Sequence, residues 1–276
     1  MRTIIYLGLL TGLCIFIGYT IGGKNGAFIA FFISILLNFF SYWFSAPIVL
    51  KMYGAKELAQ DTFPDIYRIV GGLCLKNSMP MPRIFLIDMP APNAFATGRD
   101  ENHAVVGISP SIMQLLNEEE LTGVLAHELS HIKNKDMLIS SMAATLAGAI
   151  SLVSRMMYFG GGRDEEGGSN MASFIIFLIL TPLIALLIQL AISRTREFEA
   201  DKSGSQLVGH GHGLASALQK LESCAKGHPA NGTSAQQASS HLFIVNPFQP
   251  SFIANLFSTH PPMEQRIQRL IRGMSV

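Results

Sequence analysis

The chain has 276 residues, of which 49% are hydrophobic and only 14% are charged, and its formal net charge is +1. Soluble globular proteins carry about 25% charged residues, so this composition and a mean hydropathy of +0.35 indicate a protein that resides in lipid. The small net charge excludes the basic surface that nucleic-acid binding requires. Three widely separated cysteines exclude a disulfide framework and a Cys-x-x-Cys metal site.

Two apolar segments stand first in the chain, Ile4–Ile21 and Ala27–Leu50, and each is close to the roughly 20 residues that cross a bilayer. The first segment follows Arg2, as in a signal peptide. However, it lacks an A-x-A cleavage pattern, and the second segment follows after a short glycine-rich stretch. We therefore expect an uncleaved transmembrane hairpin over residues 1–50, with its turn at 22–26.

The more polar segment 51–136 has the pattern of a mixed α and β structure. Residues 62–77 are expected to form a helix. Three short strands are predicted from alternating patterns between turn residues, at Arg83–Asp88, Asn93–Thr97 and His103–Ile108. Another helix is predicted to begin at Asn117, whose side chain can cap it, with Glu120 three residues later completing a capping box.

This helix contains His127-Glu128-Leu129-Ser130-His131, an H-E-x-x-H motif. Histidines four residues apart share one helical face, so both imidazoles can bind one metal ion. Glu128 projects beside that pair, where a carboxylate can take a proton from a water whose pKa zinc has lowered. The alternative is a solvated helix that merely carries two histidines, and the rarity of the motif argues against it.

Two further apolar segments, Met137–Phe159 and Ala172–Ile192, predict a second transmembrane hairpin over 137–192. Lysine and arginine near the span ends number eight on one side of the predicted membrane and two on the other. The positive-inside rule then places both termini and the segments 51–136 and 193–276 in the cytosol. The residues counted are Arg2, Lys51, Lys56, Lys133, Lys135, Arg194, Arg196 and Lys202, against Lys24 and Arg163.

A helix expected to run from the fourth span to about residue 208 offers a third metal ligand. Glu197 and Asp201 share one face of it, whereas Glu199 lies about 200° around the helix from Glu197. We interpret Glu197 as a zinc ligand and Asp201 as the acceptor of a histidine N–H. These acids could instead only neutralise neighbouring basic residues. However, His131 and Glu197 both lie on the order of 8–9 Å beyond the predicted spans, which favours the metal site.

Four stretches of sequence resemble the HtpX family of bacterial membrane proteases, which is related to the CAAX prenyl proteases. They are PNAFATG (92–98), VLAHELSHIKNKD (124–136), REFEAD (196–201) and STHPPMEQRI (258–267). The resemblance implies a thermolysin-like catalytic domain with one zinc ion per chain. It further implies that Asn93, Ala94, Phe95 and Ala96 form an edge strand along which the substrate binds. His260 is expected to hydrogen-bond the oxyanion, and Arg266 to orient His260 or brace the site.

The sequence as a whole predicts four transmembrane helices and an α+β zincin-like cytosolic domain that hydrolyses internal peptide bonds. By resemblance, its substrates are misfolded or damaged membrane proteins, in quality control and the stress response at the bacterial inner membrane.

Residues 225–241 are small, polar and aperiodic and predict a loop. Two alternatives are a zinc-stabilised membrane scaffold, which would normally have four Cys or His ligands, and a metal transporter. The transporter would need ionisable residues within its spans, where only Arg155 occurs.

Overall fold

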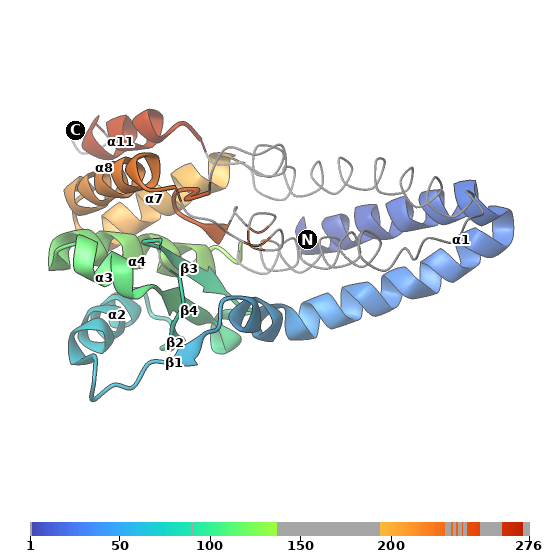
Figure 1. Cartoon of the computed structure of the whole chain (residues 1–276), viewed down its shortest axis with the longest axis horizontal. Coiled ribbons are helices and arrows are strands. Elements are labelled where there is room, and N and C mark those ends of the chain that lie inside the picture. Colours follow the sequence, from blue (N-terminus) through green and yellow to red (C-terminus); the bar gives the residue numbers. More distant parts are fainter. Residues whose placement is uncertain are drawn as a thin grey trace, which may run out of the picture.

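The computed structural model describes residues 2–89, 91–136, 194–229, 233, 236, 239, 242–248 and 261–272. The predicted spans Met137–Phe159 and Ala172–Ile192 lie outside these residues, and so does His260. Helices and a small sheet form one end of the molecule, and the long helix α1 extends away from them (Figure 1).

Helix α1 covers Arg2–Met52 and folds back on itself as two arms (Figure 1). The reversal lies at Gly22 and Gly23, whose backbone is not helical. Gly23 has a φ of 59°, a left-handed value that glycine adopts without steric penalty. Across the two arms, Nδ2 of Asn38 donates to Oγ1 of Thr11 at 2.9 Å. The reversal lies within the stretch 22–26, where the turn of the hairpin is predicted.

The second arm of α1 joins an apolar stretch to the globular region. Among the described residues, Gly22–Phe44 is a helical stretch long and apolar enough to cross a membrane, with a mean hydropathy of 1.9. Beyond this stretch, Val49 and Tyr53 are buried in a cluster whose other buried members are Ile87, Met89, Ala91, Phe95, Leu242, Phe243 and Phe248. The last turns of α1 are therefore part of the core of the globular region.

Four short strands form one sheet: β1 (Lys56–Glu57), β2 (Arg83–Leu86), β3 (Ala94–Thr97) and β4 (Val105–Ile108). Their order is β1-β2-β4-β3, with β2 and β4 parallel and the other two pairs antiparallel. Strand β3 pairs only with β4 in this sheet and forms its edge. The three predicted strands are confirmed in shorter form, and the 3₁₀ turn η1 (Glu101–His103) takes the start of the third.

The helices of the globular region are α2 (Pro64–Lys76), α3 (Pro110–Leu115), α4 (Glu118–Lys133), α7 (Arg194–Val208), α8 (His212–Gly227) and α11 (Met263–Arg272). Helices α2 and α7 confirm the helices predicted at 62–77 and up to about 208. The capping box at the start of α4 is also confirmed. Oδ1 of Asn117 accepts from the N–H of Glu120, and Oε2 of Glu120 accepts from the N–H of Asn117, both at 2.9 Å.

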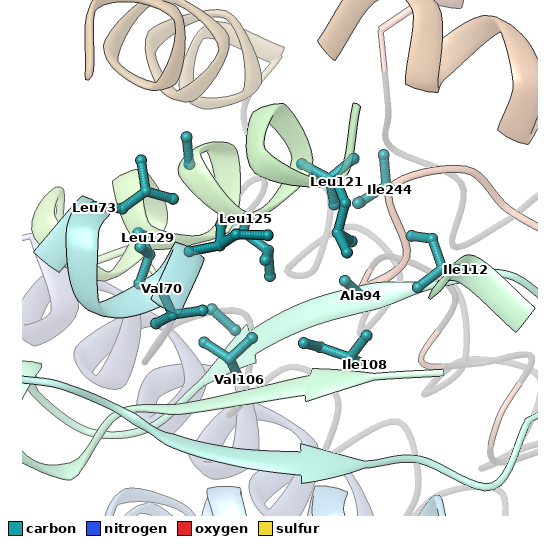
Figure 2. Close-up of a cluster of buried hydrophobic side chains, with 14 of the residues drawn as sticks. Val70, Leu73, Ala94, Val106, Ile108, Ile112, Leu121, Leu125, Leu129 and Ile244 are labelled. Atoms are coloured by element: carbon teal, nitrogen blue, oxygen red, sulfur yellow. The ribbon is translucent and has the colours of Figure 1, made fainter. Parts of the chain in front are cut away.

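Helix α4 lies between the sheet on one side and α7 and α8 on the other (Figure 1). Its leucines Leu121, Leu125 and Leu129 are buried toward Val106 and Ile108 of β4 (Figure 2). Burial of each leucine stabilises the fold by about 1.5–3 kcal/mol. This packing fixes the rotation of α4 about its axis, and thereby the direction in which its histidines point.

Candidate metal centre and its surroundings

His127 and His131 are one helical turn apart on α4 and bring their ring nitrogens together. Both Nε2 atoms lie 3.2 Å from each other, and the two rings are perpendicular. Two nitrogen ligands of a tetrahedral zinc ion, each at roughly 2.0–2.1 Å from the metal, are separated by about 3.3 Å. The spacing of the two imidazoles therefore fits a shared metal ion.

Glu197 of α7 supplies an oxygen atom to the same point. Its Oε1 lies 3.4 Å from Nε2 of His131, and its Oε2 lies 3.9 Å from Nε2 of His127. One ligand atom from each of the three residues lies within 4.8 Å of the other two. Two imidazoles and one carboxylate are a common ligand set of catalytic zinc, and they leave a coordination position open.

Close packing of α7 on α4 depends on Gly204. A Cβ atom at this position would lie only 3.0 Å from the backbone nitrogen of His127. The close approach also brings Asp201 to His127, where its Oδ1 lies 2.9 Å from Nδ1 of the ring. A carboxylate on Nδ1 favours the tautomer whose Nε2 is free to bind a metal ion.

Arg266 of α11 is fully buried and forms a two-pronged contact with Asp201. Its Nε and Nη2 donate to the two carboxylate oxygens at 2.9 and 2.8 Å. Its Nη1 lies 3.4 Å from Oε2 of Glu197 and donates to the carbonyl oxygen of Ile244 at 3.4 Å. Burial alone would raise the pKa of Asp201, but Arg266 and His127 outweigh it and lower the pKa to about 2. Arg266 thus keeps Asp201 ionised beneath the histidine.

Glu128 is buried on the side of the histidine pair that faces the sheet. Its Oε2 accepts a hydrogen bond from the backbone N–H of Ala96 in β3 at 2.8 Å. In the metal-free site, burial and the nearby Glu197 raise the pKa of Glu128 to about 7, against the opposing effect of His131. A carboxyl group with a pKa near neutrality can both accept and return a proton.

Asp136 stands behind His131 much as Asp201 stands behind His127, and the sequence reasoning missed it. Its Oδ2 lies 3.6 Å from Nδ1 of His131, and its Oδ1 lies 3.8 Å from Nη1 of the buried Arg196. Lys135, two residues after the end of α4, is left-handed, with a φ of 60°, and the N–H of Asp136 donates back to the carbonyl of His131. The sequence signal was an acid three residues after the end of the motif helix.

The charges buried around the two histidines favour a divalent cation. They are four carboxylates and two guanidinium groups, which leaves a formal charge of −2: Glu128, Asp136, Glu197 and Asp201, against Arg196 and Arg266. Burial alone would lower the pKa of His131, but Asp136, Glu197 and Glu128 raise it to about 9. The donor set and its charge therefore both fit the metal ion that the motif predicts.

The structure also places the other residues singled out from the sequence. Glu199 is exposed on α7, away from the buried Glu197. Ala94, Phe95 and Ala96 lie in the edge strand β3, and Asn93 directly precedes it. Oδ1 of Asn93 accepts from the N–H of Ile244 at 3.3 Å. The role expected for His260 falls outside the described residues.

Comparison with known proteins gives one consistent result. Residues 60–273 match the peptidase family M48. The chain is 47% identical to a protease HtpX homolog of Sulfurihydrogenibium sp. (strain YO3AOP1), over 98% of this chain and 94% of that protein. It is 48% identical to a protease HtpX homolog of Syntrophobacter fumaroxidans, over 98% of this chain and 97% of that protein.

Among solved structures, the crystal structure of S. mikatae Ste24p has a similar fold, with a TM-score of 0.52 and 19% sequence identity. The aligned region covers 96% of this chain but only 62% of Ste24p. At this level of identity, the likeness concerns the fold.

Proposed function

The chain belongs to peptidase family M48 and is a metalloprotease, and from this premise we propose that it is a zinc endopeptidase of the bacterial inner membrane. In this proposal it cuts misfolded or damaged membrane proteins at the cytosolic face, as part of protein quality control. The observation that carries the proposal is the buried site of His127, His131 and Glu197, which adjoins the edge strand β3 through Glu128.

The three residues His127, His131 and Glu197 would hold the zinc ion. When bound there, the ion would supply polarisation of a peptide carbonyl and a lowered pKa of water. Glu128 takes a proton from the attacking water and returns it to the leaving amine, with its carboxylate held toward the substrate by the N–H of Ala96. Asp201 and Asp136 orient the imidazoles, and His260 is proposed to donate a hydrogen bond to the developing oxyanion.

The outer edge of β3 supports binding of an extended polypeptide. Residues of an antiparallel strand alternate between those that bond the neighbouring strand and those whose N–H and C=O face away. The carbonyl of Asn93 accepts from the N–H of Ser109 after β4. By alternation along the strand, the N–H and C=O groups of Ala94 and Ala96 face away from β4. The outward N–H of Ala96 donates to Glu128, and the residues of β3 are buried. A substrate strand that paired with this edge would therefore lie next to Glu128 and replace its hydrogen bond to Ala96.

The alternative of a zinc-stabilised scaffold without catalysis gives Glu128 no catalytic role. A purely structural zinc site needs no general base, yet Glu128 is buried beside the metal ligands and in contact with the edge strand. Glu128→Gln should therefore abolish cleavage of casein by the purified protein while its zinc content stays at one ion per chain. A chelator should abolish cleavage by the unchanged protein. Cleavage by the variant at nearly the normal rate would rule out the proposed role.

The proposed topology places both termini and the segment 51–136 in the cytosol. Cysteines introduced at 22–26 or 160–171 should then react with an impermeant thiol reagent added to intact cells. Cysteines introduced at residue 100 or 230 should react only after the membrane has been opened. Labelling of either one in intact cells would contradict the proposed orientation.

A further inference from the structure

Two side-chain contacts join β3 and the residues after it to the last turns of α1. The ring of Phe95 lies against that of Tyr53, with 5.6 Å between the ring centroids. Four residues further along, the guanidinium carbon of Arg99 lies over the ring of Trp43, 4.4 Å from its centroid. The chain from Phe95 to Arg99 therefore runs in the direction opposite to α1, from beside Tyr53 to beside Trp43.

The lengths of the two paths are compatible. Because β3 ends at Thr97 and the chain bends at Arg99, the four residues from Phe95 to Arg99 span at most about 13 Å. Ten residues of mostly helical chain, from Trp43 to Tyr53, rise about 15 Å. Since both pairs are in contact, β3 runs alongside the end of α1 in the opposite direction. It points toward the apolar stretch Gly22–Phe44.

Trp43 lies at the end of this apolar stretch, which is the position of the lipid boundary for a helix that spans the membrane. Tryptophan gathers at the interface between hydrocarbon and water, and here its ring is covered by Arg99 and still 46% exposed. The catalytic carboxylate lies at a different level of the chain from Trp43, where Glu128 accepts a hydrogen bond from the N–H of Ala96. Ala96 precedes Arg99 by three residues, so the two levels are at most about 10 Å apart along the chain.

We propose that β3 acts as a ruler that sets the cleaved bond of a membrane-anchored substrate at a constant distance of no more than about five residues from the lipid boundary. This inference rests on the proposed function. A substrate strand paired with the outer edge of β3 follows the same line toward Trp43 and enters the bilayer there. The substrates it selects are polypeptides whose chain is extended directly beside a membrane span, and distance from the membrane outweighs side-chain sequence in choosing the bond.

The test uses the full chain in proteoliposomes and a series of single-span substrates. All carry one identical unstructured cytosolic extension, with zero, four or eight glycine and serine residues inserted between the span and the extension. Mass spectrometry of the products locates the cut. The expected result is a cut at the same distance from the span in all three substrates, so that insertion of eight residues moves the cut out of the extension and into the insert. A cut at the same peptide bond in all three substrates would overturn the ruler.

Variants at the boundary contact give a second readout. Arg99→Ala and Trp43→Ala should broaden the distribution of cuts in the membrane substrates, while cleavage of a soluble peptide with the same extension sequence stays unchanged. An unchanged distribution in both variants counts against the ruler.

Glu128→Gln separates the two proposals. Cleavage of the soluble peptide that survives in this variant refutes the proposed catalysis, and the ruler with it. If the variant loses cleavage of the soluble peptide, but the unchanged protein cuts the membrane substrates at a bond fixed by sequence, only the ruler is refuted.

Discussion

Replacement of Arg266 by alanine tests whether the site depends on a buried charge contributed by the last helix. Helix α11 also carries Arg269, which supplies a matched control on the same helix. Arg269 is exposed, and its guanidinium carbon lies 3.7 Å from the ring centroid of Phe198. Both substitutions remove one guanidinium from α11, and they differ in burial and in what the guanidinium contacts.

The expected magnitude follows from the partners that each arginine leaves behind. Arg266→Ala strands the buried Asp201, which loses two hydrogen bonds of 2.8 and 2.9 Å, and breaking a buried ion pair in this way costs about 3–5 kcal/mol. At about 2–4 °C per kcal/mol for a chain of this size, the Tm should fall by roughly 6–20 °C. Arg269→Ala loses an exposed cation–π contact of about 0.5–1 kcal/mol. Arg266→Lys should lie between them, because an ammonium cannot replace the two-pronged contact.

Thermal unfolding of the metal-free variants in detergent measures these differences, and the zinc content of separately loaded samples measures the effect on the site. We expect Arg266→Ala to weaken zinc binding as well, since Asp201 loses its support beneath His127. A Tm for Arg266→Ala that equals that of Arg269→Ala would refute the reasoning. It would mean that the buried contact makes no larger net contribution than the exposed one.

Three further predictions concern α7. Glu197→Gln should lose zinc on dialysis, whereas Glu199→Gln should keep it and remain active, and metal analysis that gives the reverse would exchange their assignments. Gly204→Ala should weaken zinc affinity about 10-fold, as changes behind metal ligands do, because its Cβ must push α7 away from the backbone of His127; an unchanged affinity would show that the helices adjust freely. In the metal-free protein, the pKa of Asp201 is about 2, below its unfolded value of about 3.9, so its ionisation contributes about 3 kcal/mol that is present above pH 4 and lost toward pH 2. The difference in stability between the wild type and Asp201→Asn should therefore shrink as the pH falls through this range, and a constant difference would contradict it.

Local periodicity was sufficient to predict the directions of the motif side chains. Residues on one face of a helix are fixed by the 100° step between neighbours, so the contrast between the buried Glu197 and the exposed Glu199 was available from sequence. The capping box of α4 was predictable for the same reason, because Asn117 and Glu120 are neighbours in the chain.

Contacts between distant segments could not be predicted in this way. The sequence left open that Glu197 and Asp201 only neutralise neighbouring basic residues, but Arg196 is buried and contacts Asp136, sixty positions earlier in the chain. The two-pronged contact of Arg266 likewise depends on how α11 packs, which periodicity does not encode. The resemblance to a known family directed attention to Arg266 without giving its partner Asp201.

The division of the site between two segments has a consequence for biosynthesis. A ribosome releases His127 and His131 well before Glu197, and Arg266 later still, with the segment 137–193 between the two halves. While the first half alone has emerged, two imidazoles and Glu128 are present without the third ligand or the guanidinium that supports Asp201. The nascent enzyme is therefore inactive at this stage, and it gains the ability to cut only once its own second half has folded.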